Sequence, residues 1–301
     1  MSPRVVWRFS DSKAGHDNQS RGLIEALQRL RPWEVVELQP LPAGLALAAA
    51  LRAPPAWRSL PRPGLLVGAG HRNHLSLLAA RRSRGGKIVV LMRPSLPLGF
   101  FDLCLIPEHD SPPPRADVLA TRGALNRIQA SATLQSDRGL LLIGGPSAHF
   151  GWDDAGLHHQ IAAILAASPE VRWTLTTSRR TPATFLTGLK SGSGPSLTVV
   201  PVVETGPDWL PAQLARSAQA WVTADSVSMV YEALTAGAAV GVLEVPRKRL
   251  SRISRGLEGL AGQGWVTPFA SWRKNAGLPR PLGAFAEADR CARWIVERWF
   301  G

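Results

Sequence analysis

Short apolar runs alternate along the chain with polar turns and with segments whose apolar residues recur at helical spacing. The apolar runs end in glycine or polar residues, which is typical of buried strands. Strands and helices that alternate in this way predict parallel sheets covered by helices, and hence an α/β fold. The predicted strands are Val5–Phe9, Leu65–Val67, Ile88–Met92, Leu103–Ile106, Leu140–Ile143, Trp173–Thr176, Leu197–Val200, Ala220–Val222 and Val240–Leu243. The predicted helices are Asn18–Leu30, His71–Arg82, Ala155–Ala167, Gln213–Ser217 and Ser228–Ala236.

The length of the chain favours two domains, because 301 residues are near the upper limit for a single core. A mostly polar stretch, Ile128 to Arg138, precedes a new strand and is the best candidate for the boundary. We expect a first domain over residues 1–135 and a second over residues 136–301. The segment Asp289–Trp299 carries two tryptophans and predicts a terminal helix that needs a docking surface.

The chain is strongly basic, with a net charge of +13. Such a charge attracts phosphates, anionic lipid surfaces or nucleic acid without choosing among them. Aromatic residues are not interleaved with the arginines as a base-stacking platform requires, so we expect no nucleic-acid partner. An anionic membrane surface stays open through the basic run Arg247–Arg255 and the apolar segment Leu45–Trp57. For both segments the alternative is an ordinary surface helix.

Cysteine use and the N-terminal pattern indicate a cytoplasmic protein. The two cysteines, Cys104 and Cys291, lie far apart and form neither a disulfide framework nor a cysteine-based zinc site. The chain passes directly into a charged strand, so we expect no secretory signal peptide. The longest apolar run, Leu41 to Leu51, is too short to span a bilayer. The sequence contains no Asp-x-Asp motif, and we expect no metal site.

A run of polar residues, Ser10 to Ser20, follows the first predicted strand. Ligands of parallel α/β sheets bind beyond the carboxyl ends of the strands, which is where this run lies. His16 has the unperturbed pKa of a general base, and Asp11 would orient it. Lys13 would hold a phosphate. The alternative is an ordinary turn that caps the following helix.

Two further turns follow predicted strands of the second half. Gly144 and Gly145 let the backbone approach a ligand closely, and Ser147 can donate to a phosphate. Hydroxyl groups beside two guanidiniums form a phosphate clamp in the next turn. The residues of this clamp are Ser178, Arg179 and Arg180. The alternatives are a plain tight turn for the first segment and an exposed basic turn for the second.

The most informative segment is a small-residue turn that leads into an apolar helix ending at Gly237. The first amides of a helix lack intrahelical partners and bind anions. The turn supplies Asp225, Ser226 and Ser228 beside these amides. Glu232 lies four residues after Ser228, faces the same way, and would accept hydrogen bonds from a sugar diol. This layout suits a nucleoside diphosphate; the alternative is a capped helix with a solvated glutamate.

Together these motifs and Pro107-Glu108-His109-Asp110 resemble those of bacterial proteins related to the plant mitochondrial fission factor named for elongated mitochondria. The resemblance covers essentially the whole chain, with the motifs in order. It differs at Ser12, where relatives more often carry a glycine. The resemblance implies a GT-B fold, with two Rossmann-like domains whose parallel sheets face each other across a cleft. A last helix at about residues 285–300 would cross back to the first domain.

The second half also resembles the glycosyltransferase that adds N-acetylglucosamine to the lipid-linked peptidoglycan precursor. The resemblance implies that Gly144, Gly145 and Ser147 meet the donor diphosphate or sugar. Ser226 and Ser228 would meet phosphate, and Glu232 would hold the ribose. Our leading hypothesis is a metal-independent glycosyltransferase whose substrate is a nucleotide-diphosphate sugar, with no cofactor.

The acceptor in this hypothesis is a lipid-linked or envelope glycan, reached at the inner face of the cytoplasmic membrane. His16, then Asp11, would take the proton from the acceptor hydroxyl. Two alternatives stay open, so the sequence does not decide whether the protein is an enzyme. One is a non-catalytic adaptor that binds a membrane or protein, because plant relatives recruit a dynamin-related protein. The other is a nucleotide-sugar epimerase.

Overall fold

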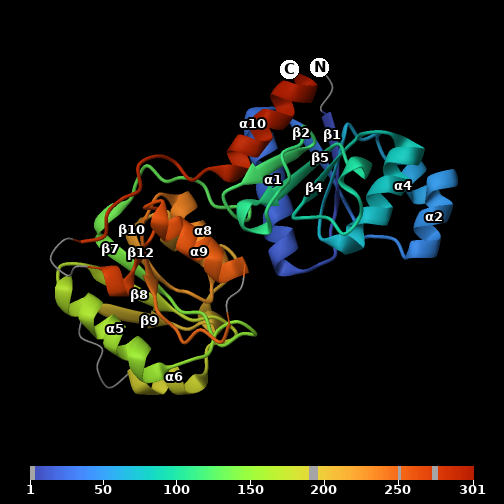
Figure 1. Cartoon of the computed structure of the whole chain (residues 1–301). Coiled ribbons are helices and arrows are strands. Elements are labelled where there is room, and N and C mark those ends of the chain that lie inside the picture. Colours follow the sequence, from blue (N-terminus) through green and yellow to red (C-terminus); the bar gives the residue numbers. More distant parts are fainter. Residues whose placement is uncertain (1–3, 190–195, 250–251, 273–276) are drawn as a thin grey trace. The chain divides into compact units, whose positions relative to one another are not determined.

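The computed structural model describes residues 4–189, 196–249, 252–272 and 277–301. The chain divides into two compact units, which are drawn in Figure 1. Unit 1 combines residues 1–127 with residues 287–301, and unit 2 consists of residues 128–286. Within the described residues each unit contains one six-stranded sheet, and all neighbouring strands are parallel. The α/β prediction is therefore confirmed.

The sheet of unit 1 has the strand order β2-β1-β3-β4-β5-β6. Its strands are β1 (Arg4–Phe9), β2 (Trp33–Leu38), β3 (Leu65–Ala69), β4 (Lys87–Leu91), β5 (Leu103–Pro107) and β6 (Val118–Thr121). Its helices are α1 (Ala14–Leu30), α2 (Ala43–Leu51), α3 (Pro55–Arg58), α4 (His74–Arg84) and α10 (Glu287–Phe300).

Helices cover both faces of this sheet. Helices α1 and α10 lie on one face, while α2 and α4 lie on the other (Figure 1). Leu27 and Ile295 pack with Leu65 in the first of these two cores. Trp7 and Leu77 are fully buried in the second. Alternate residues of each strand thus serve opposite cores, which explains the nearly continuous apolar runs in the sequence.

Arg8 of β1 is buried on the α1 side of the sheet. Its Nε donates to both carboxylate oxygens of Glu37, at 2.9 and 2.8 Å, and its Nη1 donates to Asp17 at 2.9 Å. Burial alone would raise the pKa of Asp17, but hydrogen bonds from Ser10 and Arg8 lower it below its usual value. This network attaches the first turns of α1 to the sheet, directly beside His16.

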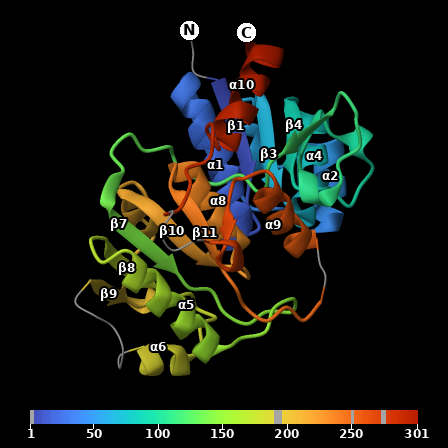
Figure 2. The same cartoon turned by 60° about the vertical axis from the view of Figure 1, so that its left-hand side comes forward.

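The sheet of unit 2 has the strand order β12-β11-β10-β7-β8-β9, and its arrangement can be followed in Figure 2. Its strands are β7 (Gln135–Leu142), β8 (Arg172–Thr176), β9 (Leu197–Val200), β10 (Ser217–Thr223), β11 (Ala239–Leu243) and β12 (Thr267–Pro268). Its helices are α5 (Asp154–Ala167), α6 (Ala183–Leu189), α7 (Trp209–Leu214), α8 (Val227–Ala236) and α9 (Arg252–Gly262). The apolar side chains of α5 and α6 pack with Trp173 and Trp221 of the sheet.

The structure corrects the predicted elements in three places. The sequence analysis missed β2, β6 and β12. Strand β2 lies at the sheet edge and exposes Glu34, so it lacks the continuous apolar run of a central strand. The predicted helix Gln213–Ser217 is wrong, because α7 ends at Leu214 and Ser217 begins β10. Helix α1 begins at Ala14 instead of Asn18, so seven of the eleven residues of the polar run are helical.

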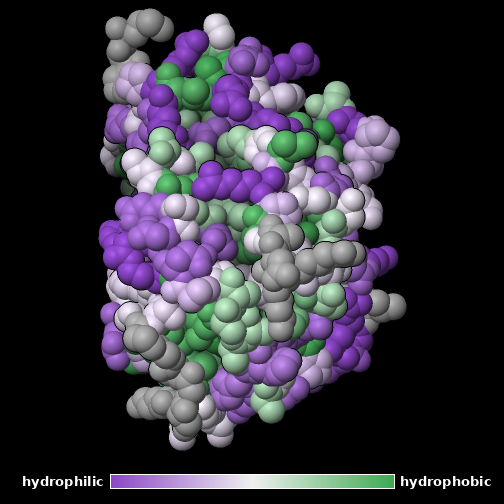
Figure 3. Space-filling model, turned by 90° about the vertical axis from the view of Figure 1, so that its left-hand side faces the viewer, coloured by the Kyte–Doolittle hydropathy of each residue, from purple (hydrophilic) through white to green (hydrophobic). Residues whose placement is uncertain are grey.

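The division between the units lies at Ile128, where the polar stretch begins. Within the described residues, no helix combines the length and the hydropathy needed to cross a bilayer. Figure 3 shows one face of the molecule, on which hydrophobic residues form small groups among hydrophilic ones. This mixture is the ordinary composition of a protein surface.

Candidate functional site

Three turns follow the carboxyl ends of the neighbouring strands β7, β8 and β10 in unit 2. Hydrogen bonds join the turn after β7 to the end of β10. The amide of Gly144 donates to Thr223 Oγ1 at 2.8 Å, and the amide of Gly145 donates to Asp225 Oδ2 at 2.9 Å. Parallel strands thus bring together two motifs that are 80 residues apart in the chain.

Arg180 connects the third turn to this pair. Its Nη1 donates to the carbonyl oxygen of Gly145 at 2.7 Å, and its Nη2 donates to Asp225 Oδ2 at 2.8 Å. A weaker contact of 3.3 Å joins Nη2 to Ser226 Oγ. The Asp225 side chain is fully buried, whereas that of Arg180 is 43% exposed. The charge of Arg180 is therefore matched by Asp225, and its first role is to hold the turns together.

Thr181 and Thr223 complete the network, and neither is among the site residues named from the sequence. Thr181 Oγ1 accepts from the amide of Ser178 at 2.8 Å and donates to the carbonyl oxygen of Gly144. Ser178 Oγ in turn accepts from the amide of Arg180 at 3.2 Å. The signal was present, since a Ser-x-x-Thr spacing is typical of hydroxyl-stabilised turns.

Gly144 and Gly145 have neighbouring atoms so close that a side chain would not fit at either position. A Cβ on Gly145 would lie 2.2 Å from the carbonyl oxygen of Arg180, and one on Gly144 would lie 2.3 Å from Asp225 Oδ2. Both distances are far inside van der Waals contact. The turn after β7 therefore has a structural reason for its glycines.

The N-terminus of α8 lies beside these turns. Ser226 occupies the N-cap position and is buried, but its side chain makes no capping hydrogen bond in the described structure. Ser228 is exposed in the first turn, and Glu232 is half-buried one turn later. Asp225 Oδ1 is buried and has no hydrogen-bond partner among the described residues. Serine capping, the alternative explanation for this turn, is not what the structure shows.

Ser147 stabilises its own turn. Its Oγ accepts from the amides of His149 and Phe150, at 3.2 and 3.1 Å. Lys248 Nζ donates to the carbonyl oxygen of Ser147 at 3.0 Å and adds a cation beside the glycine turn. Lys248 belongs to the predicted basic run Arg247–Arg255, of which residues 250 and 251 lie outside the described part of the chain.

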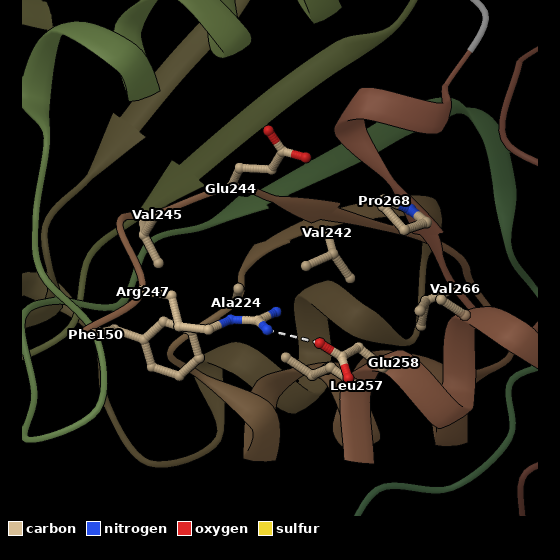
Figure 4. Close-up of a pocket in the computed structure, with 11 residues that line it drawn as sticks. Phe150, Ala224, Val242, Glu244, Val245, Arg247, Leu257, Glu258, Val266 and Pro268 are labelled. Atoms are coloured by element: carbon tan, nitrogen blue, oxygen red, sulfur yellow. Dashed lines mark hydrogen bonds and ion pairs between the residues drawn. The ribbon is translucent and has the colours of Figure 1, made fainter. Parts of the chain in front are cut away.

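An apolar cavity of about 320 Å³ lies next to the turn after β10 (Figure 4). Its volume is in the range of small-molecule sites. Figure 4 shows Val242, Val266 and Leu257 along its walls, with Arg247 and Glu258 paired at 2.6 Å. The other lining residues are Phe150, Ala224, Glu244, Val245, Ala261 and Pro268. The sequence analysis did not predict this cavity, because its walls come from segments more than 100 residues apart.

One wall of the cavity is held firmly in place. The Gln160 side chain donates to the carbonyl oxygen of Glu244 at 2.9 Å and accepts from its amide at 2.8 Å. Ala224 lines the cavity and directly precedes Asp225. The cavity and the network of turns are therefore adjacent parts of one surface in unit 2.

A second group of polar residues lies at the carboxyl edge of the sheet in unit 1. His16 Nδ1 lies 2.9 and 3.0 Å from the two carboxylate oxygens of Asp11. The Asp11 side chain is 1% exposed and that of His16 is 16% exposed. This geometry favours the tautomer with hydrogen on Nδ1, which leaves Nε2 to accept a proton. The structure thus places the two predicted residues of the acid–base pair in contact.

Gly70, which follows β3, makes room for the His16 ring. A Cβ on Gly70 would lie 2.3 Å from His16 Cε1, and the glycine has a φ of 83°. Ser12 also has a positive φ, of 61°, which is a backbone conformation that favours glycine. Lys13 is exposed at the N-cap position of α1 and makes no capping bond there.

The histidines after β3 differ in environment. His71 is exposed, whereas His74 is buried with its Nδ1 3.3 Å from Ser95 Oγ. Burial, aided by the charge of His71, lowers the pKa of His74 to about 4. Among the described residues, no group of three or more His, Cys, Asp or Glu has the arrangement of a metal site.

A comparison with family models matches residues 14–299 to the family described as Mitochondrial fission ELM1. The chain belongs to this family. The match covers nearly the whole chain, including His16 and the turns of unit 2, and begins three residues after Asp11. A comparison with curated proteins finds no match.

Solved structures similar to this member of the ELM1 family share its architecture at low sequence identity. A Listeria monocytogenes protein assigned as a UDP-N-acetylglucosamine 2-epimerase superposes with a TM-score of 0.61 at 11% identity, covering 99% of this chain and 97% of that one. For Acinetobacter baumannii MurG the TM-score is 0.52 at 14% identity, with coverage of 97% and 90%. For the S. aureus MnaA–UDP structure the values are 0.51 and 11%, with coverage of 98% and 96%. These likenesses confirm the GT-B fold.

Proposed function

We propose that this protein is a glycosyltransferase that uses a nucleotide-diphosphate sugar bound by unit 2. The observation that carries the proposal is the network of three turns, which lies beside an apolar cavity and the N-terminus of α8. Polar groups that converge next to an apolar cavity are typical of ligand sites. The fold shared with UDP-sugar epimerases and with a UDP-bound structure adds support.

The nucleotide would lie along this surface in three parts. The apolar cavity accepts the base, and Glu232 accepts hydrogen bonds from the ribose hydroxyls. The diphosphate lies at the first amides of α8, beside Ser226 and Ser228. Because Asp225 is paired with Arg180, its carboxylate presents no unmatched negative charge to the phosphates.

Transfer requires a base and a stabilised leaving group. His16 Nε2 takes the proton of the acceptor hydroxyl, whose oxygen then bonds to the anomeric carbon. The bond from that carbon to the diphosphate breaks, and the diphosphate leaves with its electron pair. The α8 amides, Arg179 and Lys248 stabilise this negative charge without a metal ion. Asp11 stabilises the imidazolium, and Lys13 offers a cation to an acceptor phosphate.

The acceptor in this proposal is a lipid-linked or envelope glycan, which the protein reaches as a peripheral protein at an anionic membrane surface. Incubation with UDP-N-acetylglucosamine, with and without bacterial lipid extract, tests the reaction class. We expect sugar incorporation into the lipid fraction and UDP release that depends on the extract. His16→Ala should lower both rates at least 100-fold. His159→Ala, a change at an exposed histidine of unit 2, should leave them unchanged.

The two alternatives give different results in the same assay. An epimerase converts the donor sugar in the absence of lipid extract. An adaptor neither binds nor converts any nucleotide sugar. If UDP-N-acetylglucosamine is inert, the other nucleotide sugars are tested under the same conditions. Failure of all of them, with folded protein, would contradict the proposal.

A further inference from the structure

Helix α2 exposes an apolar surface to solvent. The helix contains no charged residue, and all three of its leucines have large exposed fractions. Leu45 is 59% exposed, Leu47 66% and Leu51 90%. A solvated helix normally carries polar residues on its outer face. The exposed leucines of α2 therefore indicate a binding surface.

This apolar surface continues onto neighbouring elements. A groove of about 400 Å³ runs between α2 and α4, and it includes Leu75 and Phe100, which are also partly exposed. Contiguous exposed apolar residues, unlike scattered ones, mark an interaction site. We call the set Leu45, Leu47, Leu51, Leu75 and Phe100 the α2 surface.

The positive charge around the α2 surface indicates an anionic partner. From residue 38 to residue 101 the sequence contains nine lysines and arginines but no aspartate or glutamate. This segment contains every element of the α2 surface. Arg81 and Arg82 line the groove itself, and Arg52 directly follows Leu51. Of these, Arg81 is 3.4 Å from Asp102, the first acidic residue after the segment.

We propose that the α2 surface docks on an anionic lipid bilayer, with its leucines at the level of the headgroups and the arginines on lipid phosphates. Apolar side chains and cations act together in such binding, because burial adds to the attraction by anionic lipids. A protein partner or a second copy would have to offer an acidic, apolar face to match. The proposal concerns unit 1 alone and does not depend on the nucleotide site of unit 2.

Co-sedimentation of the full chain with vesicles tests this proposal. We expect binding to phosphatidylcholine vesicles with 30% phosphatidylglycerol, and weak binding to phosphatidylcholine alone. Leu47→Ser with Leu51→Ser should weaken binding at least tenfold. Arg82→Gln should weaken it about fivefold, as about 1 kcal/mol per cation predicts, and less at high salt.

The matched control is Val203→Ser with Leu282→Ser, which removes two highly exposed apolar side chains from unit 2. This variant should bind vesicles like the unchanged protein. Equal loss in the control, or absence of binding to anionic vesicles, would overturn the proposal. Unchanged binding of the double leucine variant would overturn the role of the apolar surface. Sedimentation velocity tests whether the α2 surface binds a second copy of the chain instead. A dimer in the unchanged protein that is absent in the double leucine variant would assign the surface to this second copy and overturn the proposal.

Discussion

Arg180 donates to the buried carboxylate of Asp225 at 2.8 Å while its other terminal nitrogen donates to the carbonyl oxygen of Gly145 at 2.7 Å. One partly exposed side chain thus links the turns that follow β7, β8 and β10. The amides of Gly144 and Gly145 and the hydroxyl of Thr181 make further hydrogen bonds between the same turns. Rigid positioning of several backbone segments is what a phosphate site requires.

Arg180→Ala should destabilise unit 2 by about 1–3 kcal/mol. The change leaves the buried Asp225 carboxylate without its cation, which costs more than loss of a surface ion pair. Because Arg180 is partly exposed, the loss of stability should be smaller than for a fully buried ion pair. Urea unfolding of the full chain measures the change. Arg179→Ala, a change at the neighbouring exposed arginine, should cost less than about 0.5 kcal/mol.

Gly145→Ala should weaken nucleotide binding at least tenfold, because the added Cβ displaces the backbone of Arg180. The matched control is Gly206→Ala, where a Cβ meets nothing within 4 Å. Isothermal titration of both variants with the nucleotide that the unchanged protein binds checks this prediction. Equal affinities in the two variants would show that the glycine turn lies outside the site.

Ser12→Gly should stabilise the protein slightly, by about 0.5 kcal/mol. The left-handed conformation costs a serine about 1–2 kcal/mol, and the greater entropy of unfolded glycine costs about 0.5–1 kcal/mol. Ser12→Val should destabilise it by at least about 1 kcal/mol, since a branched side chain resists this conformation. Thermal unfolding compares the two variants. A more stable valine variant would contradict the backbone conformation described for this loop.

His74 should make the protein less stable as the pH falls from 7 to 4. Burial lowers the pKa of His74 to about 4, whereas in the unfolded chain it is near 6.5. The unfolded state therefore binds more protons in this window, and stability present above pH 6.5 is lost on acidification. This difference in pKa between the folded and unfolded states corresponds to about 3 kcal/mol in the free energy of unfolding. Asp17, whose pKa is lowered below 3.8, loses its stabilising charge only at lower pH.

Urea unfolding at several pH values measures this effect. His74→Gln, which cannot titrate, should flatten the pH dependence between 4 and 6.5. His159→Gln changes an exposed histidine and should retain the slope of the unchanged protein. The same slope in all three proteins would assign the dependence to other groups.

Most of the fold was predictable from the apolar runs, because strands buried on both faces carry few polar residues. Strand β2 was not, since its exposed glutamates interrupt the run. The partners of Arg8 in β1, Glu37 and Asp17, were not predictable either, because they lie on other elements. The start of α1 was also misplaced. Polar residues in its first turns, including His16, resemble a loop in sequence although they are helical.

The site was predictable where its residues follow strands directly. His16 and Asp11 are close in sequence, and a single turn of chain brings them into contact. The pairing of Arg180 with Asp225 depends on the order of strands in the sheet, which no local pattern contains. For the same reason the cavity beside Ala224 could not be predicted, since its walls come from the segments after β7 and β10 and from β11, β12 and α9.

Calorimetric titration of the full chain with UDP, GDP, CMP and ADP tests the central claim most directly, with Glu232→Ala as the paired variant. We expect micromolar binding of one nucleotide and at least tenfold weaker binding by the variant. Unfolding curves of both proteins verify that each is folded. Binding of none of the four nucleotides by folded protein would contradict the claim that unit 2 is a nucleotide-sugar site.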